Sequence, residues 1–254
     1  MQWLLLRVRP AVVASRLKKM AGVKRIVIST EAGSFYIDPV SDFGARLSIA
    51  GAYEPDVQST LTRLLSPRGV FVDVGANEGY FSVIGAKLVG PEGRVVAVEP
   101  QTRMQEILKT NFALNKLNDV QVIPSAISNV RGSAPIFISA DVNPGSTSLH
   151  LSTKYKLPTE SVETMTLSDV FLEAHLSEVD LLKMDIEGGE YEAILASPEL
   201  FVEHRIRTLA LELHPTAIRK RGLEPQEIGR FLASCGYRID HRFSNEVWTC
   251  APAH

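Results

Sequence analysis

The sequence has little cysteine and no long hydrophobic run near its start, and both shortages exclude classes of protein. Its 254 residues contain two cysteines, Cys235 and Cys250, which are too few for a disulfide framework and lack the spacing of a metal site. The apolar run at residues 3–6 is too short for the core of a signal peptide or for a membrane span. A reducing, cytoplasmic location is therefore expected.

The chain has almost no net charge, although one segment is strongly basic. The 27 basic and 29 acidic side chains give a formal net charge of −2, which creates no global field that would favour nucleic acid. A basic stripe with interleaved aromatic residues is also missing. Residues 1–25, however, hold seven Lys and Arg side chains and no acid. A basic amphipathic helix there could make a peripheral contact with a membrane surface, or it could be a solvated helix that packs on its own domain.

A strand, a glycine turn and a helix are predicted in succession at residues 70–88. Residues 70–74 are apolar and rich in β-branched side chains, as in buried parallel strands. Gly75 and Gly79 bracket a tight turn, and apolar residues then recur at helical spacing. Such a unit forms a nucleotide-binding crevice at the carboxyl edge of a sheet. Gly75 would let the backbone approach a ligand, and the helix N-terminus offers free N–H groups.

This turn lacks the G-x-G-x-x-G pattern of dinucleotide-binding proteins, because Asn77 replaces the middle glycine. Asp73 lies two residues before the turn, where an acid suits a cationic amine such as that of S-adenosylmethionine. The next predicted strand ends in Glu99, whose carboxylate can accept both hydroxyls of a ribose and would repel the 2′-phosphate of NADP. Two alternatives remain open: Asp73 as a buried acid satisfied by loop N–H groups, and Glu99 as a solvated acid at a strand end.

Three motifs together resemble the FkbM family of S-adenosylmethionine-dependent methyltransferases. They are Asp-Val-Gly-Ala-Asn-Glu-Gly at 73–79, Glu99-Pro100, and Leu-Lys-Met-Asp-Ile-Glu-Gly-Gly-Glu at 182–190. Tyr53-Glu54-Pro55 upstream is similar to the family as well, although Tyr53 and Glu54 could simply begin a helix. Ser125 and Ala126, which follow the third strand, are expected near the adenine ring. The residues expected to bind the cofactor are Tyr53, Glu54, Asp73, Gly75, Ala76, Asn77, Gly79, Glu99, Pro100, Ser125, Ala126 and Asp185.

The predicted fold class is α/β, because strands and helices alternate along the chain. The resemblance implies a Rossmann-like class I methyltransferase fold: a mostly parallel sheet with helices on both faces and an antiparallel edge. The methyltransferase domain is expected at 51–254, after an extension at 1–50 that holds the basic helix and a β-hairpin at 24–39. Residues 41–50 are too mixed to predict an element. The predicted strands are 70–74, 95–99, 120–123, 134–139, 163–167, 179–184, 207–213, 237–240 and 247–251, and the predicted helices are 54–65, 80–88, 102–115, 168–175, 189–196 and 225–234.

Acidic residues and one histidine stand at the ends of the fourth and fifth predicted strands. Strand four presents Asp185 and Glu187, and strand five presents Glu212 and His214. The carboxyl ends of these strands converge on the cofactor crevice, so we expect the four side chains to be catalytic. His214 has the intrinsic pKa best matched to a general base, while Asp185 and Glu212 could hold Mg²⁺. Alternatively, Asp185 caps a helix, Glu187 is a surface acid and His214 is only a polar strand-end residue.

The resemblance implies O-methylation of a small-molecule hydroxyl in a sugar, a lipid or a secondary metabolite such as a polyketide. Methyltransferases that act on base amines resemble one another in an Asn/Asp-Pro-Pro-aromatic run after strand four, and this chain has Asp-Ile-Glu-Gly there. The serine-rich stretch at 145–148, in a long irregular segment at 141–159, is similar to a loop of the family and is expected to line the acceptor pocket. The alternatives are a methyltransferase of protein or RNA and a binding protein that holds the nucleotide without turnover.

Overall fold

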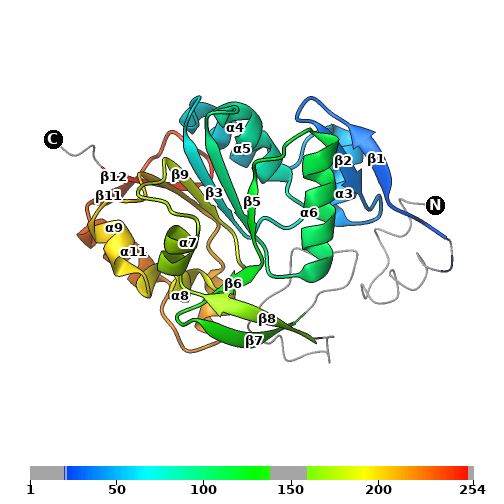
Figure 1. The fold of residues 1–254 in the computed structure, drawn as a ribbon. Helices are drawn as coiled ribbons and strands as arrows, with labels where there is room; N and C mark the ends of the chain where they lie inside the picture. Colours follow the sequence, from blue (N-terminus) through cyan, green and yellow to red (C-terminus); the bar gives the residue numbers. More distant parts are fainter. Residues whose placement is uncertain (1–19, 21, 138–158, 251–254) are drawn as a thin grey trace.

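The computed structural model describes residues 20, 22–137 and 159–250. Their largest element is a seven-stranded sheet in the order β11-β12-β10-β9-β3-β4-β5 (Figure 1). Five neighbouring strands are parallel and two form an antiparallel edge. The parallel strands are β3 (Val70–Val74), β4 (Arg94–Val98), β5 (Gln121–Ile123), β9 (Leu181–Met184) and β10 (Thr208–Leu211), and the edge strands are β11 (Tyr237–Ile239) and β12 (Glu246–Cys250). The predicted α/β class, with a parallel sheet and an antiparallel edge, is confirmed.

Helices cover both faces of this sheet, as predicted. One face carries α3 (Asp42–Ala50), α4 (Pro55–Leu64), α5 (Tyr80–Val89) and α6 (Thr102–Leu114), and the other carries α7 (Leu167–Glu173), α8 (Glu190–Leu195), α9 (Pro198–Val202) and α11 (Gln226–Ser234). The short helix α10 (Pro215–Arg219) follows β10. Among the described residues, no helix is both long and apolar enough to cross a membrane.

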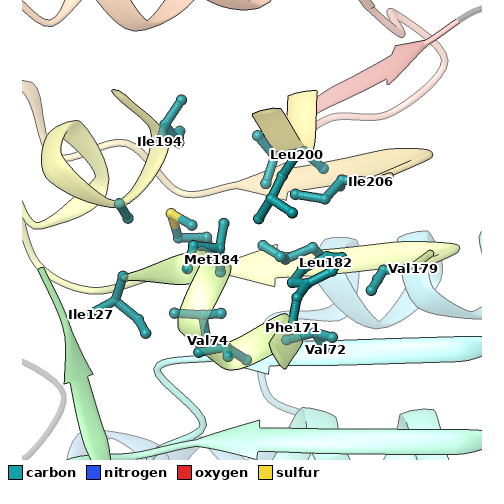
Figure 2. Packing of buried hydrophobic residues seen from close by; sticks show 14 of the residues in the cluster. Val72, Val74, Ile127, Phe171, Val179, Leu182, Met184, Ile194, Leu200 and Ile206 are labelled. Atoms are coloured by element: carbon teal, nitrogen blue, oxygen red, sulfur yellow. The ribbon is translucent and has the colours of Figure 1, made fainter. Parts of the chain in front are cut away.

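Alternate side chains of each central strand enter two separate cores. Val72 and Val74 of β3 pack against α7, α8 and α9, in the core drawn in Figure 2 around Leu182 and Met184 of β9. Phe71 of β3 faces the opposite way, toward α5 and α6. Because neighbouring residues of a strand point to opposite faces, Asp73 lies on the same side as Phe71. A carboxylate inside an apolar strand is thereby directed toward α5.

The β-hairpin predicted at 24–39 is present as β1 (Ile26–Ser29) and β2 (Ser34–Ile37). It lies beside α6 and packs into the same core as α5, through Phe35 and Ile37. The helix α3, where no element was predicted, begins after Ser41, whose hydroxyl accepts a hydrogen bond from the Gly44 N–H at 2.9 Å. This N-terminal cap stabilises a helix whose sequence pattern is weak.

A small second sheet contains the strands predicted at 134–139 and 163–167. Its order is β6-β8-β7, with β6 (Ser125–Ile127), β7 (Gly132–Phe137) and β8 (Thr159–Met165). Ser125 and Ala126, expected only to follow the third strand, lie in β6. The basic N-terminal helix and the serine-rich stretch at 145–148 fall on residues outside those described, apart from residues 20 and 22–25.

Candidate functional site

The turn between β3 and α5 is fixed by two glycines in left-handed conformations. Gly75 has φ 81° and Gly79 has φ 80°, values that favour glycine. A Cβ at Gly75 would overlap with the Asp185 carbonyl oxygen, and one at Gly79 would come within 2.9 Å of Leu108 Cβ on α6. The glycines are thus required for close packing of this turn against its own neighbours. This differs from the predicted reason for Gly75, which was the approach of a ligand.

The carboxylate of Asp73 is completely buried and has two partners. It accepts a hydrogen bond from the Ser82 hydroxyl at 2.6 Å, and the Lys183 ammonium lies 3.4 Å from its second oxygen. Lys183 also donates to the Gly75 carbonyl at 3.2 Å and lies 4.0 Å from Asp185. Burial lowers the pKa of this lysine, but the attraction of Asp73 and Asp185 outweighs it, so the pKa is raised. Lys183 therefore places a positive charge between Asp73, which is expected to bind the cofactor, and Asp185 of the predicted catalytic residues.

Glu99 joins the same turn at the end of β4. Its carboxylate is buried and accepts hydrogen bonds from the Asn77 N–H at 2.8 Å and the Gln101 N–H at 2.9 Å. Burial raises the pKa of Glu99 to about 7 in spite of these bonds. Each oxygen keeps a lone pair for a further donor. The structure thus excludes the solvated alternative and leaves Glu99 able to accept ribose hydroxyls.

Besides the Asp73 oxygen that faces Lys183, two buried polar atoms near the crevice have no hydrogen-bond partner among the described residues. They are the side-chain oxygens of Asn77, in the turn after β3, and of Ser125, two residues after the end of β5. Both belong to segments at the carboxyl edge of the sheet, where the cofactor is predicted to bind. Unpaired polar atoms in this position fit a site that is completed by a polar ligand, because burial without a partner is costly.

Tyr53 and Glu54 lie at the start of α4, beside the same edge of the sheet. Glu54 precedes the helix in a left-handed conformation (φ 42°) and makes no capping hydrogen bond with its side chain. Tyr53 packs edge-on against Phe43 and Tyr80, with ring centroids 5.1 and 6.1 Å away. Burial and the adjacent Glu54 raise the pKa of its phenol. The tyrosine is therefore a neutral, packed side chain. The pair lies at the start of a helix, and its contact with the cofactor stays a prediction.

The four predicted catalytic residues meet at one edge, although not on the strands themselves. β9 ends at Met184 and β10 at Leu211, so all four residues lie in the loops that follow. His214 Nε2 is 3.8 Å from Asp185 and 3.5 Å from Glu187. Pro215, which has no N–H to offer a sheet, begins α10 directly after His214. The four residues were predicted at strand ends and lie just beyond them, and the predicted convergence at one edge is confirmed.

A buried acid that was not predicted, Glu190, holds His214 in place. Its carboxylate is fully buried, lies 3.0 Å from His214 Nδ1, and accepts the N–H groups of Ile186 and Gly188. The hydrogen bond to Glu190 is the main cause that raises the pKa of His214 to about 9. At neutral pH, His214 is consequently an imidazolium ion. The available signal was an acid near the start of a predicted helix, directly after Glu187-Gly188-Gly189. It resembled an ordinary charged surface residue.

Glu187 differs from His214 because burial favours its neutral form. Burial raises its pKa to about 7, against the attraction of His214, and its backbone is left-handed with φ 53°. Partial burial, followed by the repulsion of Asp185, also raises the pKa of Glu212, although much of this residue stays exposed. Asp185 does not cap α8, because Gly189 occupies that position. The cluster thus contains a histidine cation and a carboxyl group that changes charge near neutral pH.

The structure brings most of the predicted site together. Gly75, Ala76, Asn77 and Gly79 form the turn, Glu99 and Pro100 follow β4, and Asp185 lies against Gly75. Asp73 contacts Lys183 and Ser82, and its expected contact with a cofactor amine stays a prediction. Sequence reasoning gave no functional part to Lys183, Glu190 or Glu78. A charge inside an apolar strand run, as at Lys183, was a usable signal, because such a charge must be paired.

Comparisons with known proteins give two matching family profiles and one curated relative. The profile of the methyltransferase FkbM domain matches residues 73–239, and that of protein-L-isoaspartate(D-aspartate) O-methyltransferase matches residues 11–129. Methyltransferase sdnD of Sordaria araneosa is 30% identical over 178 residues, which are 58% of this chain and 68% of that protein.

Two solved structures are also similar. A precorrin-6y C5,15-methyltransferase from Geobacter metallireducens GS-15 has 15% identity and a TM-score of 0.44, over 78% of this chain and 87% of that chain. A protein-L-isoaspartate O-methyltransferase has 22% identity and a TM-score of 0.28, over 30% of this chain and only 24% of that chain.

Proposed function

Because this chain belongs to the FkbM methyltransferase family, and so uses S-adenosylmethionine, we propose that it methylates a hydroxyl oxygen of a sugar, lipid or secondary metabolite. The observation that carries the proposal is the cluster of Glu187, Asp185 and His214 at the carboxyl edge of the sheet. A hydroxyl must lose its proton during the transfer. A carboxylate with a pKa near 7 is suited to accept it.

The residues at the other end of this edge fit the cofactor. Glu99 would accept the ribose hydroxyls, and Asn77 and Ser125 would give their unpaired oxygens to polar groups of the ligand. When bound, S-adenosylmethionine supplies a methyl group activated by a positively charged sulfur. Lys183 lies between the two regions and neutralises Asp73 and Asp185, which would otherwise repel each other.

We assign the proton acceptor role to Glu187 in place of His214. An imidazolium with a pKa of about 9 has no lone pair to offer at neutral pH. As the acceptor oxygen forms its bond to the methyl carbon, its proton passes to Glu187, and the bonding pair of the departing C–S bond stays on sulfur. His214 keeps Asp185 and Glu187 from repelling each other. The products are the methyl ether, S-adenosylhomocysteine and a protonated Glu187.

The cluster does not fit Mg²⁺ well. Asp185, Glu212 and His214 each offer one ligand atom within 4.8 Å of the others, but Mg²⁺ prefers oxygen ligands. The histidine is held as a cation by Glu190 and would have to lose its proton before it could bind a metal. We therefore assign no step to a metal, and expect EDTA to leave turnover unchanged.

Transfer of a radioactive methyl group from S-adenosylmethionine tests the proposal. The purified chain would be offered sugars, hydroxylated lipids and polyketide alcohols, with RNA and a protein mixture as rival acceptors. Label recovered as a methyl ether that resists mild base supports the proposal. Label recovered only in RNA or protein would overturn the acceptor class, and binding of S-adenosylhomocysteine without any turnover would favour the non-catalytic alternative.

The location of the protein is a separate proposal. The acid-free segment at 1–25 supports a cytoplasmic protein that makes a peripheral contact with anionic lipid. Cosedimentation with vesicles that contain phosphatidylserine, compared with neutral vesicles, tests it. Equal binding to both, or to neither, would rule out an electrostatic contact.

A further inference from the structure

The cofactor turn contains a buried charge that the proposed mechanism does not use. Glu78, next to Asn77, is 2% exposed. Its two carboxylate oxygens accept hydrogen bonds from the two terminal nitrogens of Arg25, at 2.8 and 3.0 Å. This is the parallel, two-bond arrangement in which arginine binds carboxylates most strongly. Arg25 is thus the direct partner of an acid in the middle of the turn.

Arg25 is itself anchored to the hairpin. One of its nitrogens donates to the Tyr36 carbonyl at 3.1 Å, and the guanidinium lies 5.8 Å from the centre of the Tyr36 ring. The same stretch of β2 reaches the turn by a second path through α6. The Tyr36 N–H donates to the Asn111 side chain at 2.6 Å, and Asn111 donates to the Glu78 carbonyl at 2.7 Å. Side chain and backbone of Glu78 are therefore both tied to β2.

Glu78 is the chain neighbour of Asn77, which contacts a second residue of the predicted cofactor site. Asn77 donates its N–H to Glu99, and its own side-chain oxygen is one of the unpaired atoms described above. Burial raises the pKa of Glu78 while Arg25 opposes that change; Asp38 and Arg103 are the other charges that act on it. Without Arg25, the acid would have to become neutral or move toward water. A carboxylate that moves toward water would pull on the adjacent Asn77, whose N–H is the donor to Glu99.

We propose that Arg25 is a positioning residue for S-adenosylmethionine binding, which locks the cofactor turn through its two-bond ion pair with Glu78. Arg25 lies 48 positions before residue 73, where the match to the family profile begins. The ion pair therefore connects the segment in front of the matched region to the cofactor site. It gives the β-hairpin a function in ligand binding as well as in packing.

Calorimetry with S-adenosylhomocysteine on the full chain tests this proposal. Arg25→Ala is expected to weaken binding roughly 10- to 100-fold, as for loss of a charge-assisted hydrogen bond that supports a site. Arg25→Lys keeps the charge but not the fork geometry and should fall in between. Arg207→Ala is the matched control, since Arg207 also bridges acids, Glu178 and Asp180, but at the opposite edge of the sheet. The control should bind as the unmodified chain does.

The double variant Arg25→Ala/Glu78→Gln separates positioning from general damage. Removing the stranded charge should restore part of the affinity lost in Arg25→Ala, because the two residues act as a pair. If Arg25→Ala unfolds the chain, the affinities of Arg25→Lys and Glu78→Gln for S-adenosylhomocysteine are compared with that of the unmodified chain instead. Binding within twofold of the unmodified chain in folded Arg25→Ala would overturn the proposal. An equal loss of affinity in the single and double variants would overturn it too.

Discussion

Glu187 combines two properties that a general base needs: a pKa of about 7 and a position 3.5 Å from a histidine cation. A base must be ionised to work, so kcat/KM is expected to rise with pH through an apparent pKa near 7. Glu187→Gln should remove this rise and lower turnover roughly 10²- to 10⁴-fold, while affinity for S-adenosylhomocysteine changes far less. The exposed Glu203→Gln is the control. A Glu187→Gln enzyme with the original pH profile would show that another group takes the proton.

Glu190 and His214 make a second prediction that does not need the acceptor. The folded-state pKa of His214, about 9, lies above the unfolded value of about 6.5. The stabilisation from its charge is therefore complete below pH 6.5 and is lost as the pH rises through 9, by roughly 3 kcal/mol at most. Urea unfolding at pH 6 and pH 9.5 measures this loss, which should be smaller in His214→Asn.

Titration of the His214 ring by nuclear magnetic resonance gives the direct comparison. Glu190→Gln keeps the shape of the side chain but removes the charge that holds the proton, so the pKa should fall well below 9. A pKa near 6.5 in the unmodified chain would contradict the assignment of His214 as a cation and would restore it as the better candidate base.

The sequence predicted which side chains form the catalytic cluster, but it did not predict their charge states. Asp185, Glu187, Glu212 and His214 stand at predictable strand ends, and parallel strands bring such ends to one edge. The charge state of His214 depends on Glu190, which approaches it from α8 across a separate loop. The partner of Glu78 is even more distant in the chain. Such pairings follow from three-dimensional packing, which a single sequence does not specify.

Among the structural elements, the turn after β3 contains a glycine, Gly75, that can be compared with Gly222, which follows α10. Gly75 and Gly222 have similar left-handed φ angles, 81° and 76°. A Cβ at Gly222 would meet nothing within 4 Å, whereas one at Gly75 would overlap with the Asp185 carbonyl. Gly222→Ala should therefore destabilise the protein by about 1 kcal/mol, for backbone strain alone. Gly75→Ala should add roughly 1–3 kcal/mol of steric overlap and abolish cofactor binding.

Denaturant unfolding of both variants, followed by calorimetry, checks this difference. Equal destabilisation by the two substitutions would mean that the turn can move away from Asp185 and that the contact is not tight.

The existence of the turn was predicted correctly, because a β-branched run, two glycines and a helical period follow one another in the sequence. The helix α3 was not predicted, because its apolar residues are interrupted and its start depends on a local hydrogen bond that the Ser41 hydroxyl accepts from the Gly44 N–H.

In the molecule as a whole, residues 35–47 contribute to the core on the α5 side of the sheet. Phe35 and Ile37 of β2, and Phe43 and Leu47 of α3, are buried in the same cluster as Phe71 of β3. The sequence places a boundary at residue 50, since the family resemblance begins there. The packing predicts that a chain without residues before 50 is unstable, because their removal would expose the apolar side chains of this cluster to water. The domain boundary suggested by motifs and the unit that folds are thus expected to differ.

Two truncations and one pair of substitutions test this expectation. A chain that begins at Lys24 keeps Arg25 and the hairpin, and should bind S-adenosylhomocysteine as the full chain does. A chain that begins at Gly51 should fail to fold cooperatively. Phe35→Ala, at a completely buried position, should lower the free energy of unfolding by about 3–5 kcal/mol. Val27→Ala, in the same hairpin but 54% exposed, should change it by less than about 0.5 kcal/mol. A folded, ligand-binding chain that begins at Gly51 would show that the hairpin and α3 only decorate an independent domain.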